Sequence, residues 1–261
     1  MNAHVYTGNV RFIDIIQRKC KVTLIFCEKS QVDSELIDYC HWNGIAIEII
    51  DTERMTVDIC FDDVDVAFSF GFGQIFSAEY IERYPMGIWN IHTGKLPKYR
   101  GRHPISHAFL NHDKDIGISI HQINEKIDQG NMIASASIIR SFTDTEESII
   151  DKTLDLLQDS LLEVAFRNYV EGNTFQISKG SYLSNFLDGI VLEKTENHSC
   201  DFVYDAVRSQ VNHGGVFLNG KYIFQAHYYS PIINYGESWE KVQCSDGFMM
   251  ITSAKMSEIE L

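Results

Sequence analysis

The segment from Lys21 to Cys27 (Lys-Val-Thr-Leu-Ile-Phe-Cys) constrains the fold more than any other part of this sequence. Its apolar and β-branched residues fall on both faces of an extended chain, which is the pattern of a strand buried on both sides. Further apolar runs of strand length occupy residues 45–50, 64–70, 87–92 and 117–123, and helix-like segments occupy 9–18, 32–42 and 77–83. This alternation predicts an α/β fold with a Rossmann-like, mostly parallel sheet and helices on both faces.

The pattern changes after residue 143. From Asp144 to Tyr169 the apolar residues keep the 3.6-residue period of an amphipathic helix, and Gly172-Asn173 is a typical end for it. Short strand-like pieces follow, and Asn219-Gly220 stands between two of them, as in a tight hairpin. We therefore expect a main domain over residues 1–184 and a small C-terminal β-rich appendage over residues 185–261.

Composition narrows the classes of partner. The chain has 261 residues and a formal net charge of −14, and such a surface repels the phosphates of nucleic acids. No stretch approaches the roughly 18 apolar residues needed to cross a bilayer, and the N-terminus lacks the pattern of a secretory signal. The six cysteines include no Cys-x-x-Cys pair and suit a reducing compartment. We expect a cytoplasmic protein with neither a nucleic-acid nor a membrane partner.

Three polar residues are candidates for catalysis. Asn90 and His92 stand two apart at the end of a predicted strand, so both side chains point to one face of the sheet. In open α/β sheets ligands bind at the carboxyl ends of strands, although the two residues equally suit the capping of backbone groups there. Asp128 follows the strand-like run 117–123, and alone it is typical of a turn aspartate before a glycine.

Taken together, these residues resemble a known signature. Asn90-Ile91-His92 precedes Leu96-Pro97-Lys98-Tyr99-Arg100-Gly101, Gly117-Ile118-Ser119-Ile120-His121 follows, and Asp128-Gln129-Gly130 closes the series. In that order the motifs are similar to those of the folate-dependent formyltransferases. The resemblance implies transfer of a formyl group from 10-formyltetrahydrofolate, as co-substrate, to an amine.

The chemistry of this reaction needs the three residue types. An amine must lose a proton when it attacks the formyl carbon, and His92 suits the role of base because an imidazole titrates near neutral pH. Asn90 offers an amide N–H to the oxygen that becomes negative in the tetrahedral intermediate. Asp128 can orient the imidazole and relay protons. His121 is a weaker candidate, since its place on the strand also suits a packed histidine that orients the loop.

The segment Ser69–Phe76 contains two glycines but lacks the third that a dinucleotide-binding loop requires. By resemblance, this is where the family binds the pterin of the folate, whereas a plain glycine-containing turn is the alternative interpretation. The predicted folate contacts lie here and in the loop of residues 124–128. They are Phe72, Gly73, Ile75, Asn124 and Ile127.

The loop after His92 bears on the acceptor. It resembles that of bacterial enzymes that N-formylate nucleotide-linked amino sugars, which implies contacts to a diphosphate. The predicted substrate-binding residues are Lys95, Lys98, Tyr99, Arg100 and Arg102. Arg100 is equally suited to pin the loop through backbone carbonyls. The alternatives are a methionyl-tRNA or other small-amine formyltransferase and a formyltetrahydrofolate hydrolase, in which water replaces the amine.

Two further features remain open in the sequence. His103 and His107 are four apart in a predicted helix, with His112 nearby, but no fixed third metal ligand is evident and surface histidines explain the pattern equally well. We expect no metal in the reaction. The apolar hairpin residues Phe217 and Phe224 are compatible with a homodimer.

Overall fold

The computed structural model describes residues 1–51, 55, 61–183, 189–210 and 213–255. These residues pack into two compact units, each with its own sheet. Unit 1 comprises Met1–Arg100, Gly117–Ile138 and Asp151–Ser181, and unit 2 comprises Gly101–Ile116, Ile139–Ile150 and Tyr182–Leu261. The domain boundary predicted at residues 184/185 lies outside the described residues.

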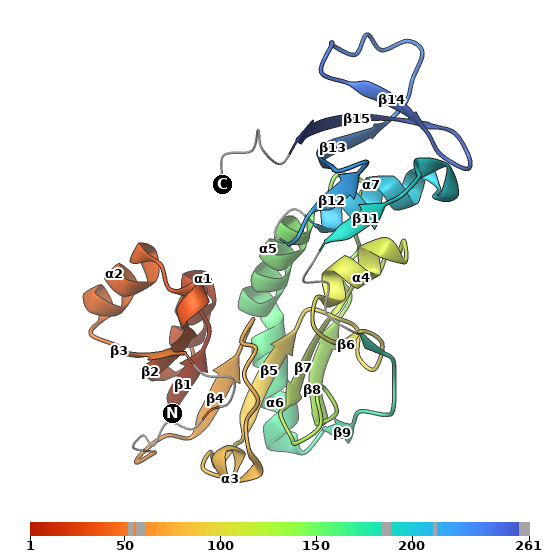
Figure 1. Cartoon of the computed structure of the whole chain (residues 1–261). Coiled ribbons are helices and arrows are strands. Elements are labelled where there is room, and N and C mark those ends of the chain that lie inside the picture. The colour runs from red at the N-terminus through yellow and green to blue at the C-terminus, as the bar shows by residue number, and fades with distance from the viewer. Residues whose placement is uncertain (52–54, 56–60, 184–188, 211–212, 256–261) are drawn as a thin grey trace. The chain divides into compact units, whose positions relative to one another are not determined.

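Unit 1 is built on an eight-stranded sheet in the order β3-β2-β1-β4-β5-β7-β8-β9 (Figure 1). The strands are β1 (Asn2–Tyr6), β2 (Lys21–Glu28), β3 (Ala46–Ile50), β4 (Val66–Ser69), β5 (Ile88–His92), β7 (Ile118–Gln122), β8 (Asn131–Ala136) and β9 (Phe175–Gln176). The pairs from β3 to β5 are parallel, whereas β7, β8 and β9 join antiparallel. The predicted α/β fold with a mostly parallel sheet is confirmed.

The helices of unit 1 begin and end at recognisable signals. Asn9 and Asp33 cap the first turns of α1 and α2 with their side chains, and Gly44 and Gly172 adopt positive φ at the ends of α2 and α6, where a Cβ would be strained. The long helix predicted from residue 144 begins at Glu146 and contains one π-helical turn before α6. The elements are α1 (Val10–Gln17), a 3₁₀ turn (Lys29–Gln31), α2 (Ser34–Asn43), α3 (Ala78–Ile81), α5 (Glu146–Leu156, whose first turn belongs to unit 2), the π turn (Leu157–Leu161) and α6 (Leu162–Glu171).

Unit 2 contains a five-stranded sheet in the order β11-β12-β13-β15-β14, and the predicted β-rich C-terminal region is confirmed. Its strands are β11 (Ile190–Leu192), β12 (Val216–Leu218), β13 (Lys221–Tyr228), β14 (Glu240–Gln243) and β15 (Phe248–Lys255). Asn219 and Gly220 both have positive φ and join the antiparallel β12 and β13, as their sequence predicts. The short strands β6 (Arg100–Gly101) and β10 (Tyr182–Leu183) pair separately.

Unit 2 also contains helices, which the sequence pattern indicated less clearly than its strands. α7 (Cys200–Ser209) packs against β13 and against α4 (Pro104–Leu110), and a 3₁₀ turn occupies Thr195–Asn197. The α7 face that includes Val203 and Ala206 is fully buried in the core of the unit. Among the described residues, no helix is long and apolar enough to cross a bilayer.

A buried polar histidine lies in the core of unit 1. His4 on β1 is 4% exposed, and its Nδ1 lies 2.9 Å from the hydroxyl of Tyr84, which is also in contact with the hydroxyl of Tyr6. Burial lowers the pKa of His4 from 6.5 to about 4, because a charged imidazole would lose its hydration there.

This shift makes the stability of the protein depend on pH. Between pH 6.5 and about 4, His4 binds a proton in the unfolded chain but not in the folded chain. The contribution of neutral His4 to the free energy of unfolding is therefore complete above pH 6.5 and decreases as the pH falls from 6.5 to about 4. The slope is at most about 1.4 kcal/mol per pH unit, the limit for one proton. We expect His4→Asn to lose less stability over this window than the wild type in urea unfolding followed by circular dichroism. Equal losses of stability in His4→Asn and in the wild type would contradict the assignment of this pH dependence to His4.

Candidate active site

The register between β5 and β7 brings the first catalytic candidates together. These strands are antiparallel, with Asn90 opposite His121 and His92 opposite Ser119. Directly opposed residues of an antiparallel pair point to the same face, so all four side chains share one side of the sheet. The Asn90 amide nitrogen consequently lies 3.2 Å from Nε2 of His121.

The Asp128 carboxyl group lies between two imidazoles. Oδ2 is 3.7 Å from Nδ1 of His92, and Oδ1 is 3.3 Å from Nε2 of His121. The side chains are 10%, 6% and 2% exposed respectively, so the group is almost completely removed from solvent. Asp128 itself has a positive φ of 52°, an uncommon conformation for an aspartate, and the loop holds it in place.

Backbone carbonyls fix the tautomers of both rings. Nε2 of His92 is 2.8 Å from the carbonyl oxygen of Tyr99, and Nδ1 of His121 is 2.8 Å from that of Gln122. A carbonyl only accepts hydrogen bonds, so each of these nitrogens carries a proton. In the neutral rings, Nε2 of His121 then accepts from the Asn90 amide, and Nδ1 of His92 presents a lone pair towards Asp128. A carboxylate that faces a lone pair is unfavourable unless a proton lies between them, and the arrangement therefore suits proton transfer.

The environment keeps His92 neutral at physiological pH. Burial lowers the pKa of His92, the neighbouring Asp128 raises it, His121 lowers it, and the hydrogen bond to the Tyr99 carbonyl raises it, with burial the largest effect. A neutral imidazole is the form that accepts a proton. His92 can thus serve as a base without first being deprotonated.

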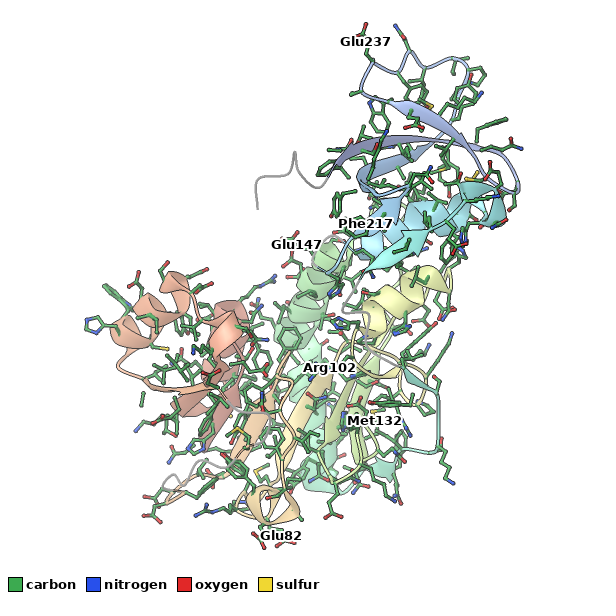
Figure 2. All side chains as sticks on the ribbon, in the orientation of Figure 1. Glu82, Arg102, Met132, Glu147, Phe217 and Glu237 are labelled. Atoms are coloured by element: carbon green, nitrogen blue, oxygen red, sulfur yellow. The ribbon has the colours of Figure 1, made fainter. Side chains whose placement is uncertain are left out.

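The loop after β5 is anchored to the neighbouring strand. The hydroxyl of Ser119 donates to the Gly94 carbonyl at 2.8 Å and accepts from the Leu96 backbone N–H at 3.1 Å. The Tyr99 backbone N–H donates to Ser181 Oγ at 3.1 Å. Leu96 also packs with Met132, labelled in Figure 2, and the Leu96–Pro97 peptide bond is cis. These contacts hold the Tyr99 carbonyl where it orients His92.

The predicted substrate-binding residues differ in exposure. Tyr99 is buried, and it touches the site through its backbone carbonyl. Arg100 is buried as well, and its backbone N–H donates to the Ser181 carbonyl. Lys95 and Lys98 are exposed on the loop, with the Lys98 ammonium over the Tyr99 ring, and Arg102 in unit 2 is exposed (Figure 2).

The predicted folate contacts are equally varied. Ile75 and Ile127 are about half-exposed, at 54% and 47%, and offer apolar surface to a ligand. Phe72 packs onto the aromatic core of unit 1, with its ring 5.2 Å from that of Tyr6. The backbone N–H of Gly73 donates to the Glu28 carboxylate.

The last predicted folate contact organises its own loop. The Asn124 side chain accepts from the Lys126 backbone N–H at 2.9 Å and donates to the Gln129 carbonyl at 3.2 Å. These bonds shape the loop that carries Asp128. The contacts of His121 with Asn90 and Asp128 were not apparent from the sequence, because they depend on strand register and on a loop conformation.

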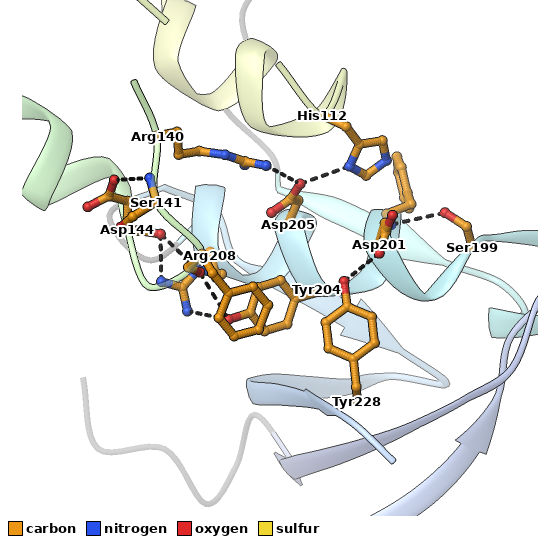
Figure 3. A network of polar contacts seen from close by, with 12 residues as sticks. His112, Arg140, Ser141, Asp144, Ser199, Asp201, Tyr204, Asp205, Arg208 and Tyr228 are labelled. Carbon is orange, nitrogen blue, oxygen red and sulfur yellow. Dashed lines mark hydrogen bonds and ion pairs between the residues drawn. The ribbon is translucent and has the colours of Figure 1, made fainter. Parts of the chain in front are cut away.

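Unit 2 has a polar network of its own, shown in Figure 3. Oδ2 of Asp205 accepts from Arg140 at 2.9 Å and lies within hydrogen-bond distance of His112 Nδ1, at 2.8 Å. The Arg208 guanidinium donates to the Asp144 carbonyl. The network surrounds a cavity of about 150 Å³. Its charges neutralise one another, which is typical of a group that stabilises the fold.

Comparison with known proteins finds formyl transferases that are similar to this chain around the site. A profile described as Formyl transferase matches residues 51–165, which include Asn90, His92 and Asp128. A methionyl-tRNA formyltransferase of Finegoldia magna is 25% identical over 81% of this chain and 74% of its own length. Another, of Borreliella burgdorferi, is 34% identical over 53% of the chain, and the match spans only 40% of that relative.

Solved structures share the fold over the whole chain. A sugar 3N-formyl transferase, crystallised in the presence of dTDP and 5-N-formyl-THF, has a TM-score of 0.69 at 19% identity and covers 99% of both chains. An N-formyltransferase from Helicobacter canadensis, in complex with folinic acid and dTDP-3-aminofucose, has a TM-score of 0.69 at 18% identity, covering 97% of this chain and 99% of its own. Together with the profile match over the catalytic candidates, these structures make the chain similar to formyl transferases in sequence over residues 51–165 and in fold over nearly its whole length.

Proposed function

We propose that this protein is an N-formyltransferase that moves the formyl group of 10-formyltetrahydrofolate to the amine of a nucleotide-linked amino sugar. The observation that carries the proposal is the buried group in which Asp128 lies between His92 and His121, with Asn90 beside it. This group can take up one proton, release another and stabilise a negative oxygen, and formyl transfer requires all three.

In the proposed reaction the amine nitrogen attacks the formyl carbon, and a C–N bond forms as the carbonyl oxygen becomes negative. One N–H of the Asn90 amide faces His121, and the second is available to that oxygen. The amine loses its proton to neutral His92. The intermediate then collapses with cleavage of the bond to the folate nitrogen N10, and the proton passes to that nitrogen with Asp128 as relay.

Support for the folate donor comes from apolar surface and from relatives. Ile75 and Ile127 present half-exposed side chains of the kind that pack against a planar ring. The sugar 3N-formyl transferase and the Helicobacter canadensis enzyme were crystallised with formyl-THF and folinic acid. On this proposal, Phe72 and Gly73 shape the pocket, and Asn124 positions the loop that closes it. No step of the proposed transfer requires a metal.

A nucleotide-linked sugar as acceptor is supported by the length of chain over which the fold is similar to those of the two solved N-formyltransferases. The sugar 3N-formyl transferase and the Helicobacter canadensis enzyme are covered over 99% of their chains, unit 2 included. The exposed ammonium groups of Lys95 and Lys98 lie on the loop that begins at the catalytic strand, and they suit a diphosphate. Arg102 is exposed a few residues further on.

A second candidate is the formylation of methionyl-tRNA, which the sequence relatives favour. Binding of tRNA needs cations that can pair with phosphates. In the C-terminal region, Arg208 donates to a backbone carbonyl, Lys221 pairs with Glu240, and the Lys241 ammonium lies over the Tyr229 ring. Together with a net charge of −14, this favours the sugar. The cytoplasmic location and a homodimer, to which the 45% exposed Phe224 would contribute, are also part of the proposal.

We expect a direct assay to identify the acceptor. The protein is incubated with 10-formyltetrahydrofolate and, in separate reactions, with dTDP-, UDP- and CDP-linked amino sugars or with methionyl-tRNA, and the products are analysed by mass spectrometry. A nucleotide sugar should gain one formyl group, and methionyl-tRNA should not. Formylation of the tRNA alone would favour the second candidate, and loss of the formyl donor without any formylated product would favour a hydrolase.

Variants test the roles in the site. His92→Ala and Asp128→Asn should each lower kcat by roughly 10²–10⁴-fold, the usual contribution of a positioned acid or base. Folate binding, followed by fluorescence, should stay within a few-fold of the wild type, because neither group is needed for contact with the pterin. His41→Ala, at an exposed position of α2, is the matched control and should be fully active. If folate binding disappeared together with turnover in His92→Ala, the residue would be structural.

The lowered pKa of His92 can be measured directly. In an NMR titration of the imidazole, assigned with His92→Gln, the midpoint should lie below 6.5, because burial opposes protonation. Asp128→Asn should lower the midpoint further, since the carboxyl group is the main influence that raises this pKa. Asp14→Asn, at a half-exposed position, should leave it unchanged. A midpoint that rises in Asp128→Asn would contradict the proposed coupling.

A further inference from the structure

Three potential metal ligands converge in unit 2 from segments far apart in the sequence. His103 immediately precedes α4, Glu146 is the first residue of α5, and His213 follows α7. One nitrogen of each imidazole and one carboxylate oxygen all lie within 4.8 Å of one another. None of the three belongs to the site proposed for formyl transfer, which lies in unit 1.

The contact between Glu146 and His213 is not a hydrogen bond. Glu146 Oε2 and His213 Nε2 lie only 2.8 Å apart, yet both are buried atoms that lack a hydrogen-bond partner. The side chains are 9% and 15% exposed, so water cannot easily replace the missing bonds. The pair is close enough for an ion pair, but neither atom completes a hydrogen bond, which is costly for buried polar groups. A cation beside both atoms, reached by a small separation of the two side chains, would satisfy them together.

The remaining contacts of the cluster fit the same explanation. The hydroxyl of the fully buried Ser106 lies 3.5 Å from the other carboxylate oxygen, Oε1, and leaves Oε2 to the cluster. The rings of His103 and His213 have centroids 4.2 Å apart at an interplanar angle of 79°. His103 has a φ of 56°, and Pro104 follows it, so its backbone is held in an uncommon conformation where the ring meets the cluster.

We propose that His103, Glu146 and His213 bind a divalent zinc ion. Two imidazole nitrogens and one carboxylate oxygen are a donor set that zinc accepts, with the fourth position open to water. Ligand atoms around a tetrahedral zinc lie about 3.4 Å apart, because each bond is about 2.1 Å. Atoms already within 4.8 Å of one another reach this geometry through small side-chain rotations.

In this proposal the ion links the residue before α4, the first turn of α5 and the segment after α7, and adds to the packing of α4 on α7 within unit 2. The sequence spacing suggested only His103 with His107 as a possible pair of ligands, and no metal was predicted. In the structure His103 lies just before α4 while His107 is buried within it, and Glu146 and His213 are the residues that meet His103.

Metal binding can be tested on the full-length protein. After treatment with chelator and its removal, the protein is titrated with zinc chloride in competition with a chromophoric chelator, and separately with cobalt chloride while the visible spectrum is recorded. We expect one zinc per chain, a rise in the melting temperature on zinc addition, and cobalt absorption bands typical of a four- or five-coordinate site with nitrogen ligands.

Variants separate this site from adventitious binding. Glu146→Gln and His213→Gln should each weaken zinc binding by at least roughly 10–100-fold and abolish the zinc-dependent rise in melting temperature. Glu147→Gln, at the exposed neighbouring position, and His41→Gln, on the exposed end of α2, are matched controls that should bind zinc like the wild type.

Equal zinc affinity in the wild type, Glu146→Gln and His213→Gln would overturn the proposal, as would a wild type that shows neither a stoichiometric zinc site nor a cobalt spectrum. Because the cobalt spectrum is recorded on the wild type, the proposal can be tested even if a variant fails to fold.

Discussion

The antiparallel register between β5 and β7 is the constraint on which the proposed active site depends. It sets Asn90 against His121 and His92 against Ser119 on one face of the sheet. A slip by one residue would turn every side chain of one strand to the opposite face and separate these pairs. The same register lets Ser119 bind the loop after β5 at Gly94, so it also determines where the Tyr99 carbonyl meets His92.

Burial gives this geometry its chemical consequence. His92 is 6% exposed, and burial lowers its pKa, while the adjacent Asp128 acts in the opposite direction. The balance yields an imidazole that is neutral at physiological pH and close to a group able to take up its proton. Backbone carbonyls hold both rings in one tautomer, so little reorganisation is required when the proton moves.

Much of this could be predicted from the sequence, and the limits are instructive. The apolar run of residues 21–27 identified a buried strand, and the two-residue spacing of Asn90 and His92 placed them on one face. Spacing cannot reveal strand register, so the contact of His121 with Asp128 was not visible. Glu146 and His213 were missed as a pair because tertiary packing alone brings them together. Tyr99 was predicted to bind substrate, a role that stays a prediction, and the contact of its carbonyl with His92 was not considered.

The proposal of a nucleotide-linked acceptor depends on where the Lys and Arg side chains lie and on which groups they already contact. In the C-terminal region, Arg208 donates to a backbone carbonyl, and the chain as a whole carries a net charge of −14. A polyanion the size of tRNA needs many phosphate contacts spread over a surface, whereas a diphosphate needs only two or three cations at one place. Lys95 and Lys98 are two exposed cations on the single loop next to His92, and Lys98 keeps its ammonium over the Tyr99 ring. For the function proposed here, an acidic protein with two lysines on the loop beside the candidate catalytic strand suits a compact phosphorylated acceptor better than a nucleic acid.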